Sequence, residues 1–287
     1  KQLCQKQCDR NLEYPPNRDP FRPPISITTT GIAKLLNNLN THKAAWPDGI
    51  SLMVLKELSS VTAPVLQIIF CRSLTTHQVP DDWRKALVTP IFKKGDKDCV
   101  ASSRPISLTC ICSKLLERII TKNIITHLEH HNLLFPLQHG FRELRSCESQ
   151  LIEFVNEIIG NPRAKQTDII ITDFLKVVDK VPHNRPLFKF ESYVIRDDVL
   201  LWIRAFLENR QQRVVVDSER TDFAAVLSSV PQGSMIGPVL FVAYINDLPG
   251  NIRSKVRLFA VNTIIYMTIA SEENCIQLQE DLDAMQK

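Results

Sequence analysis

Two short apolar runs near the end of the chain, residues 255–260 and 263–269, are separated by only two residues. Runs rich in branched and aromatic side chains on either side of such a tight turn predict two strands. A third apolar run, residues 168–172, ends at Asp173 and is typical of a buried strand. These three segments require a sheet in the second half of the chain.

Helical patterns surround these strands. Thr28 can cap a helix whose apolar residues recur at helical spacing. Further helices are expected at residues 51–58, 63–78, 109–131, 147–159, 184–192, 197–208, 237–248 and from about 271. Additional strands are expected at residues 86–92 and in a hairpin of 213–217 with 223–228. Helices come first, and strands mixed with helices follow, so the pattern predicts an α+β fold.

The composition excludes several classes of protein. With 287 residues, 44% of them hydrophobic, the chain can bury a sizeable core and is not disordered, collagen-like or a disulfide scaffold. No uninterrupted apolar run reaches the roughly 18 residues typical of a membrane-spanning helix. The eight cysteines lack zinc-site spacing, so we expect reduced thiols in an intracellular protein of the cytoplasm or nucleus. Because the chain starts at Lys1 without a leader sequence, we expect a segment of a longer protein with no secretion signal.

The net charge is only +4, but the charges are segregated along the chain. Basic residues cluster between positions 84 and 145, whereas residues 272–283 are acidic. This pattern fits a basic groove for nucleic acid, and it also fits solvated helix faces, which the charge pattern alone favours. The sequence leaves the oligomeric state open.

Several motifs carry more specific information. The segment VPQGS at residues 230–234, followed by GP at 237–238 and YINDLP at 244–249, resembles the nucleotide-site loop and helix of reverse transcriptases from non-LTR retrotransposons, of the LINE-type, jockey-like group. Further blocks that resemble motifs of this family occur in the family's order at residues 43–50, 91–96, 104–108, 138–146, 173–183 and 255–260. The resemblance covers about residues 25–287, and a match of this many motifs in one order is hard to attribute to chance.

The resemblance implies a right-hand polymerase with fingers and palm, an antiparallel palm sheet packed with helices, and RNA-directed DNA polymerase activity. It implies fingers and fingers–palm helices at residues 28–165, and a palm at 166–287 that includes a fingers/palm hairpin near 212–228. Residues 1–27 are Pro-rich and irregular, which by itself predicts an extended lead-in. The thumb is expected to be missing. The implied partners are an RNA template, a DNA primer and a deoxynucleoside triphosphate (dNTP), with no membrane.

In this family, carboxylates from two palm strands hold two Mg²⁺ ions for phosphoryl transfer. By resemblance Asp173 is the first metal ligand, although its position alone is better explained by a solvent-facing residue at a strand end. The family's next ligands form an Asp-Asp pair, but this chain has Val261 and Asn262. Val261 offers no ligand atom and Asn262 only a neutral oxygen, whereas carboxylate oxygens suit Mg²⁺. We therefore expect weak or absent Mg²⁺ binding and a catalytically inactive domain.

The remaining site positions also follow from the resemblance. The family's nucleotide-binding positions match Lys93, Arg104, Phe174, Val178, Gln232 and Gly233, and its template-binding positions match Arg142 and Arg145. Lysine and arginine suit phosphate contacts, but the residues alone are equally compatible with surface cations and a plain turn. Val178 replaces the aromatic residue that excludes a 2′-hydroxyl, so a working site would discriminate less against ribonucleotides.

Other positions depart from the family pattern. Trp46 and Ser229 replace glycines, Ser103 replaces a tyrosine, and Leu175 replaces a small polar residue. Three interpretations stay open: a reverse transcriptase domain that has lost activity, a non-catalytic nucleic-acid-binding remnant, and a decayed mobile-element copy without function. The preserved apolar patterning of the second half favours a core that can fold.

Overall fold

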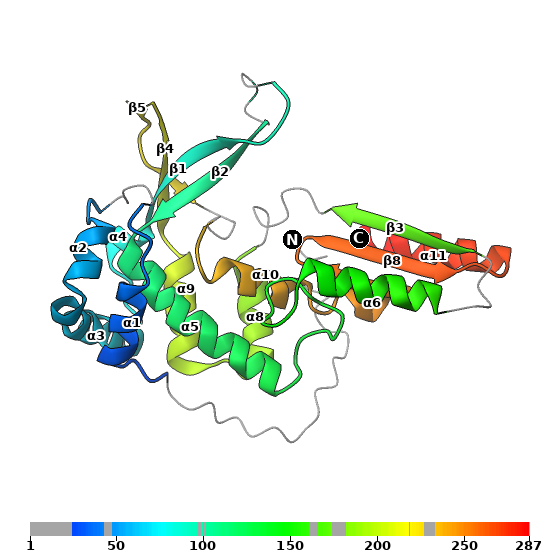
Figure 1. Ribbon diagram of the computed structural model, residues 1–287, viewed down its shortest axis with the longest axis horizontal. Helices are drawn as coiled ribbons and strands as arrows, with labels where there is room; N and C mark the ends of the chain where they lie inside the picture. The colour runs from blue at the N-terminus through cyan, green and yellow to red at the C-terminus, as the bar shows by residue number, and fades with distance from the viewer. Residues whose placement is uncertain are drawn as a thin grey trace.

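The structure is a computed structural model, and it describes residues 25–42, 48–96, 99, 102–160, 166–173, 182–217, 219–226 and 233–286. Helices combine with two sheets, which confirms the predicted α+β class. Figure 1 shows the helical body with the larger sheet above it, and the smaller sheet at the opposite end of the molecule. None of the described helices is both long and apolar enough to cross a membrane.

Most helices pack around one large apolar core. The side chain of Thr28 accepts a hydrogen bond from the backbone N–H of Gly31, so the first helix begins where the sequence predicts. The core includes the fully buried Phe70, Trp202 and Phe206. The helices of this half are α1 (Thr29–Asn37), α2 (Leu52–Glu57), α3 (Ser59–Thr76), α4 (Asp81–Arg84), α5 (Ile111–His130), α8 (Asn184–Ser192), α9 (Asp197–Leu207) and α10 (Gly237–Ile245).

The larger sheet has the strand order β2-β1-β4-β5, with β6 also paired to β4. Its strands are β1 (Lys85–Phe92), β2 (Ser103–Thr109), β4 (Arg210–Val216), β5 (Glu219–Arg220) and β6 (Ala224–Val226). Strand β2 was not expected from the sequence, and the helix expected from residue 109 begins two residues later. The reason is that Thr109 pairs with Ala86 in the antiparallel β1–β2 ladder.

The hairpin expected near residues 212–228 is present as β4 and β6, with Gln212 opposite Ala224. Strand β4 also pairs in parallel with β1, with Lys85 opposite Gln211. The hairpin therefore belongs to the sheet of the first half of the chain, although it follows β3 in sequence. A boundary at residue 166 does not separate the two sheets.

The smaller sheet is antiparallel, with the order β3-β8-β7. It consists of β3 (Thr167–Asp173), β8 (Asn262–Thr268) and β7 (Lys255–Phe259), and it agrees with the expected palm sheet. Alternate residues of a strand face opposite sides. Val256 and Leu258 accordingly pack with Phe241 of α10, whereas Arg257 contacts α6 (Cys147–Ile159) on the other side.

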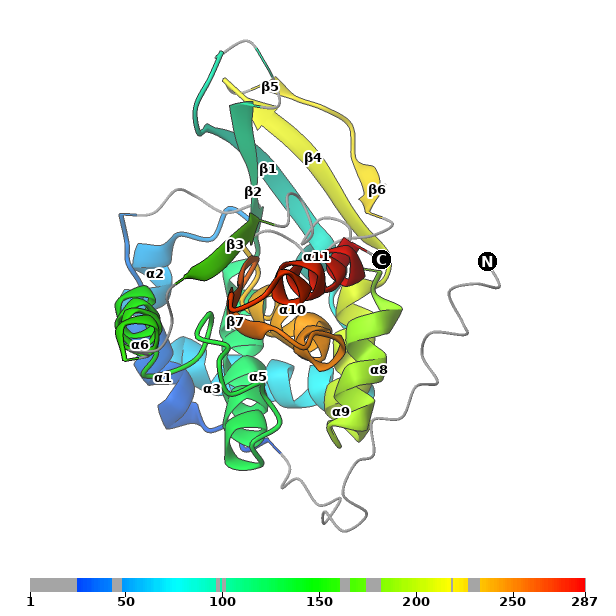
Figure 2. The same cartoon turned by 90° about the vertical axis from the view of Figure 1, so that its right-hand side faces the viewer.

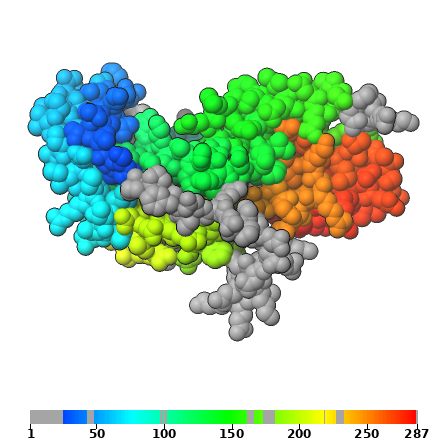
Figure 3. Space-filling view, turned by 90° about the horizontal axis from the view of Figure 1, so that it is seen from below, coloured from blue at the N-terminus to red at the C-terminus, as the bar shows by residue number. Residues whose placement is uncertain are grey.

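The end of the described chain is anchored to this sheet. Helix α11 (Glu272–Gln286) follows β8, and its Asp281 accepts hydrogen bonds from the backbone N–H and the hydroxyl of Ser254, just before β7. Figure 2 shows α11 and α6 on different sides of β3 and β7, and Figure 3 shows the chain extended from the first helices to β8 and α11. Each of the six cysteines within the described residues is a free thiol, as expected.

Candidate functional site

The turn between β7 and β8 lies beside the end of β3. The backbone of Asp173, the last residue of β3, pairs with Asn262, the first residue of β8. Val261 lies in the turn itself and packs, partly buried, against the small core of the palm-like sheet that includes Phe241 and Leu258. In Figure 1 the arrowhead of β3, which marks this end of the strand, lies on the side of the smaller sheet that faces the middle of the molecule. The strand register thus brings the three expected metal-site positions to one end of one sheet.

The donor groups at this end of the sheet do not fit a pair of catalytic Mg²⁺ ions. Val261 packs against apolar side chains and has no ligand atom, and the exposed Asn262 carries no charge. Mg²⁺ is held by oxygen ligands, commonly carboxylates, in near-octahedral geometry. Within the part of the chain that the structure describes, no group of three or more His, Cys, Asp or Glu side chains could hold a metal ion.

A segment more than a hundred residues earlier in the chain contacts the turn. Ala260 has a left-handed backbone, with φ of 52°. Its N–H donates to the side-chain oxygen Oε1 of Gln138 at 3.2 Å, and the N–H of Gly140 donates to the same oxygen at 2.8 Å. A Cβ atom on Gly140 would lie 2.3 Å from the Ala260 nitrogen, so only glycine permits this approach.

Main-chain hydrogen bonds join the same segment to β7. The N–H of His139 donates to the carbonyl of Leu258 at 2.9 Å, and the N–H of Leu258 donates to the carbonyl of Leu137 at 3.1 Å. The side-chain amide of Gln150, on α6, adds a bond to the Leu258 carbonyl at 3.1 Å. Residues 137–140 therefore lie along β7 as a short parallel partner of that strand.

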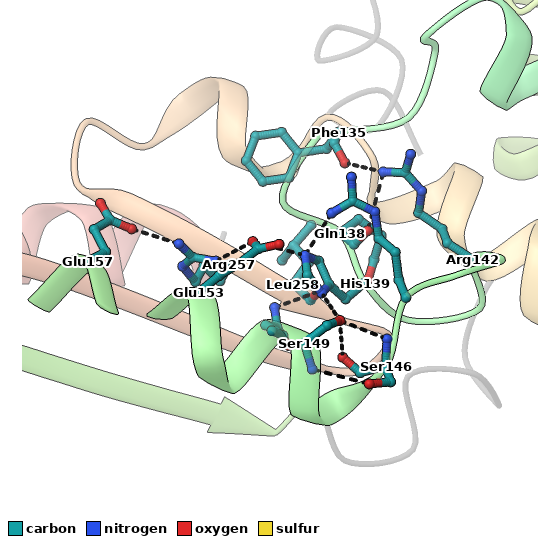
Figure 4. A network of polar contacts seen from close by, with 12 residues as sticks. Phe135, Gln138, His139, Arg142, Ser146, Ser149, Glu153, Glu157, Arg257 and Leu258 are labelled. Carbon is teal, nitrogen blue, oxygen red and sulfur yellow. Dashed lines mark hydrogen bonds and ion pairs between the residues drawn. The ribbon is translucent and has the colours of Figure 1, made fainter. Parts of the chain in front are cut away.

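A polar network joins α6 to the other face of the sheet (Figure 4). The side chain of Arg257 is only 5% exposed, and its guanidinium donates to Glu153 at 3.2 Å and Glu157 at 2.7 Å. The Tyr266 hydroxyl and Lys255 also donate to Glu157, each at 2.5 Å. Burial raises the pKa of Glu157, but bonds from Lys255, Tyr266 and Arg257 outweigh it and hold that pKa at about 2.

The two arginines expected to contact the template both have partners within the protein. Both nitrogens of a guanidinium fork on Arg142 bind Glu129, at 2.6 and 2.5 Å, and Arg142 also donates to the carbonyl of Phe135 at 3.1 Å. Arg145 lies 2.8 Å from Nε2 of His139. Burial lowers the pKa of His139, and Arg145 adds to this effect against an opposing effect of Glu153. Neutral His139 can therefore accept from Arg145, and a template contact by either arginine stays a prediction.

The expected nucleotide-binding residues fall into a second region, on the larger sheet. Arg104 pairs with Ile91, and the N–H of Lys93 donates to the carbonyl of Ser102 at 2.9 Å, so both exposed cations lie at the far end of the β1–β2 hairpin. Gly233 has φ of 109°, and a Cβ there would lie 2.8 Å from the carbonyl oxygen of Ser107 on β2. Phe174, Val178 and Gln232 lie outside the described residues, as do Trp46, Leu175 and Ser229.

Two supporting residues were not identified as such from the sequence. The side-chain amide of Asn246 accepts from the N–H of Phe135 at 2.7 Å and donates to the carbonyl of Leu133 at 2.7 Å. Asn246 thereby fixes the loop that leads into residue 138. Glu117 of α5, fully buried, accepts from the N–H of Met235 at 2.8 Å, close after Gly233, and burial raises its pKa. The sequence signals that could have identified them are a polar residue, Asn246, directly after an apolar helix, and an acidic residue, Glu117, within the expected helix 109–131.

Comparisons with known proteins bear on this arrangement. Residues 91–287 match the family model described as reverse transcriptase (RNA-dependent DNA polymerase). The chain is 27% identical over 252 residues to the RNA-directed DNA polymerase from mobile element jockey of Drosophila melanogaster, covering 86% of this chain and 27% of that protein. The corresponding jockey protein of Drosophila funebris is 28% identical over 278 residues, covering 92% of this chain and 30% of that protein.

A third relative comes from another element. The Drosophila melanogaster protein named "Probable RNA-directed DNA polymerase from transposon X-element" is 27% identical over 247 residues, covering 85% of this chain and 26% of that protein. The chain thus spans less than a third of the length of each of these three relatives. Because the family model covers well over half of the chain, the resemblance is confirmed: the chain belongs to the reverse transcriptase (RNA-dependent DNA polymerase) family.

Proposed function

We propose that this chain is the polymerase domain of a non-LTR retrotransposon protein and that it has lost most or all catalytic activity. The observation that carries the proposal is the register of β3 with β8, in which Asp173 stands opposite Asn262 with Val261 in the adjoining turn. Two-metal phosphoryl transfer needs negative oxygen ligands that hold cations against the reacting phosphate. One carboxylate, one neutral amide and one aliphatic side chain supply too little charge for that task.

In this proposal the two sheets have separate tasks. Residues 28–165 form the fingers and the fingers–palm helices, and residues 166–287 form the palm, which includes the fingers/palm hairpin near 212–228. Lys93 and Arg104, exposed at the end of the β1–β2 hairpin, bind the triphosphate of a dNTP through charge-assisted hydrogen bonds. Gly233 permits the backbone at its own position to approach β2 closely. Gln232, Phe174 and Val178 complete the nucleotide-binding positions.

A second candidate function is binding of RNA or DNA without catalysis. It is favoured by the exposure of Lys93, Lys94 and Arg104 in a chain in which two of the three metal-ligand positions carry no charge. Phosphate contacts of this kind give an affinity that falls steeply with salt and depends little on sequence. Titration of RNA at several salt concentrations, with Lys93→Ala and Arg104→Ala in parallel, measures that slope. A salt-independent affinity would exclude this function.

Primer extension on an RNA template tests the main proposal. We expect no extension by the native chain with Mg²⁺ or Mn²⁺, and measurable extension by the Val261→Asp, Asn262→Asp double variant. Adding Asp173→Asn to the double variant is the control, and it should abolish the gained activity. Robust processive synthesis by the native chain would refute the proposed loss of activity. A folded double variant that binds Mn²⁺ but stays silent would refute the metal-site explanation of that loss.

A further inference from the structure

We propose that Gln138 is a positioning residue for the β7–β8 turn, which it holds through its side-chain carbonyl oxygen. The inference deepens the proposed function, on which it rests in one respect: the turn is taken as the place where the family's metal carboxylates stand. Gln138 itself is not proposed to touch substrate or metal.

The first argument is the convergence of hydrogen bonds on one atom. Oε1 of Gln138 accepts from the N–H of Ala260 and from the N–H of Gly140, which come from two segments 120 positions apart. Because both partners are donors, the network fixes the orientation of the amide and identifies the oxygen. The bond to Ala260 is made at the residue that immediately precedes Val261 and has the left-handed backbone. A shift of Gln138 would therefore be transmitted directly to the turn.

The second argument is that the main-chain hydrogen bonds between residues 137–140 and β7 end before the turn. The bonds of residues 137 and 139 to Leu258 secure the body of β7, two residues before the turn. Gly140 lies against the backbone of Ala260, and this close contact is possible because glycine has no Cβ atom. Gly140 therefore has no side chain with which to bind the turn. Of the polar contacts between the 137–140 segment and the turn, the one that binds a turn N–H uses the Gln138 side chain.

The third argument separates positioning from simple stabilisation. Nε2 of Gln138 is buried and has no hydrogen-bond partner in the described part of the protein, and the whole residue is only 1% exposed. A buried donor without an acceptor opposes folding. An amide that keeps this unfavourable nitrogen is a poor choice for stability alone. What it supplies is an acceptor oxygen at the correct place under the turn.

The expected consequence concerns metal geometry. Ligand sets for catalytic cations tolerate displacements of well under an ångström before affinity and rate fall. A turn released from Gln138 would carry carboxylates at 261 and 262 into a broader range of positions. The effect should appear as weaker metal binding and a lower kcat in a chain whose carboxylates have been restored, with little change in KM for the nucleotide.

The test uses two substitutions and a matched control. Gln138→Met keeps the side-chain volume but removes the acceptor, and Gln138→Glu keeps an acceptor oxygen. Phe70→Leu, in the core of the helical half, lowers stability far from the turn. Each is made in the native chain, for amide hydrogen exchange at Gly140 and Ala260, and in the Val261→Asp, Asn262→Asp background, for Mn²⁺ affinity measured by electron paramagnetic resonance.

We expect Gln138→Met to speed exchange at the two amides at least tenfold and to raise the Kd for Mn²⁺ at least fivefold. In Gln138→Glu, the exchange rates and the Kd for Mn²⁺ should be close to those of the chain with Gln138. Phe70→Leu should lower the thermal midpoint and leave the exchange rates and the Kd near their starting values. Unchanged exchange in Gln138→Met, or equal effects in Gln138→Met and Phe70→Leu, would overturn the inference. If the double variant binds no Mn²⁺, the metal-site explanation in the proposed function fails, and the exchange result in the native chain alone decides the role of Gln138.

Discussion

The ion-pair network between α6 and the smaller sheet makes a quantitative prediction at Glu157. Burial raises the pKa of this carboxyl, but the bonds from Lys255, Tyr266 and Arg257 lower it from 4.5 to about 2. At about 1.4 kcal/mol per pH unit, that difference corresponds to about 3 kcal/mol of stability. Because the side chain is 31% exposed, solvent screening reduces the expected contribution to about 1–2 kcal/mol.

The sign of the pH dependence follows from the lowered pKa. The contribution is fully present above the unfolded-state pKa near 4.5 and is lost as the pH falls toward about 2. Glu157→Gln should therefore lower the free energy of unfolding by about 1–2 kcal/mol at pH 7, measured by urea denaturation. At pH 3.5 the deficit should be clearly smaller, because the native carboxylate has lost part of its advantage.

Glu208→Gln provides the control, since Glu208 is exposed at the end of α9. It should change the free energy of unfolding by less than about 0.5 kcal/mol at either pH. Two results would refute the reasoning about Glu157. One is a Glu157→Gln deficit that is the same at pH 7 and pH 3.5, and the other is a deficit at pH 7 no larger than that of the control.

Two further substitutions test the packing of the fold. Gly140→Ala should destabilise the protein by about 2 kcal/mol or more, because its Cβ would lie 2.3 Å from a backbone nitrogen. Gly250→Ala is the control, since a Cβ there meets nothing within 4 Å, and it should change stability by less than about 0.5 kcal/mol. Thermal unfolding compares the two variants. Ser73→Ala should cost about 1–3 kcal/mol in urea denaturation, since the buried indole N–H of Trp202 donates to this hydroxyl at 3.0 Å, and a cost near zero would show that water replaces it.

Local patterns were sufficient to predict most elements of the fold. The cap at Thr28, the apolar spacing of α5 and the paired strands β7 and β8 all depend on residues close together in sequence. Strand β2 contains Pro105, and its pairing with β1 crosses a loop, so nothing local identified it. The parallel pairing of β1 with β4 joins segments 126 positions apart at Lys85 and Gln211, which no periodicity could indicate.

The site was predictable only where the family resemblance supplied positions. Asp173 has the sequence context of any strand-end carboxylate, and only the register with Asn262 shows that the two stand opposite one another. The role of Gln138 depends on a bond that spans 122 positions. The motif around Arg142 gave no sign of its internal ion pair with Glu129, and its template contact stays a prediction. Burial and pairing, which decide what a charge does, are properties of the fold.

If the proposed function holds, the turn also bears on how the domain keeps its architecture without the family's metal carboxylates. Carboxylates at 261 and 262 would add two negative charges beside Asp173, and like charges at facing strand positions oppose folding unless a cation is bound. Val261 instead packs against the apolar cluster that includes Phe241, and Asn262 adds no charge. The present turn therefore suits folding without metal, and its backbone is held by Gln138, while Arg257 binds the neighbouring strand β8 through Tyr266. The fold can persist without metal carboxylates because the side chains that hold its backbone are not those at positions 261 and 262.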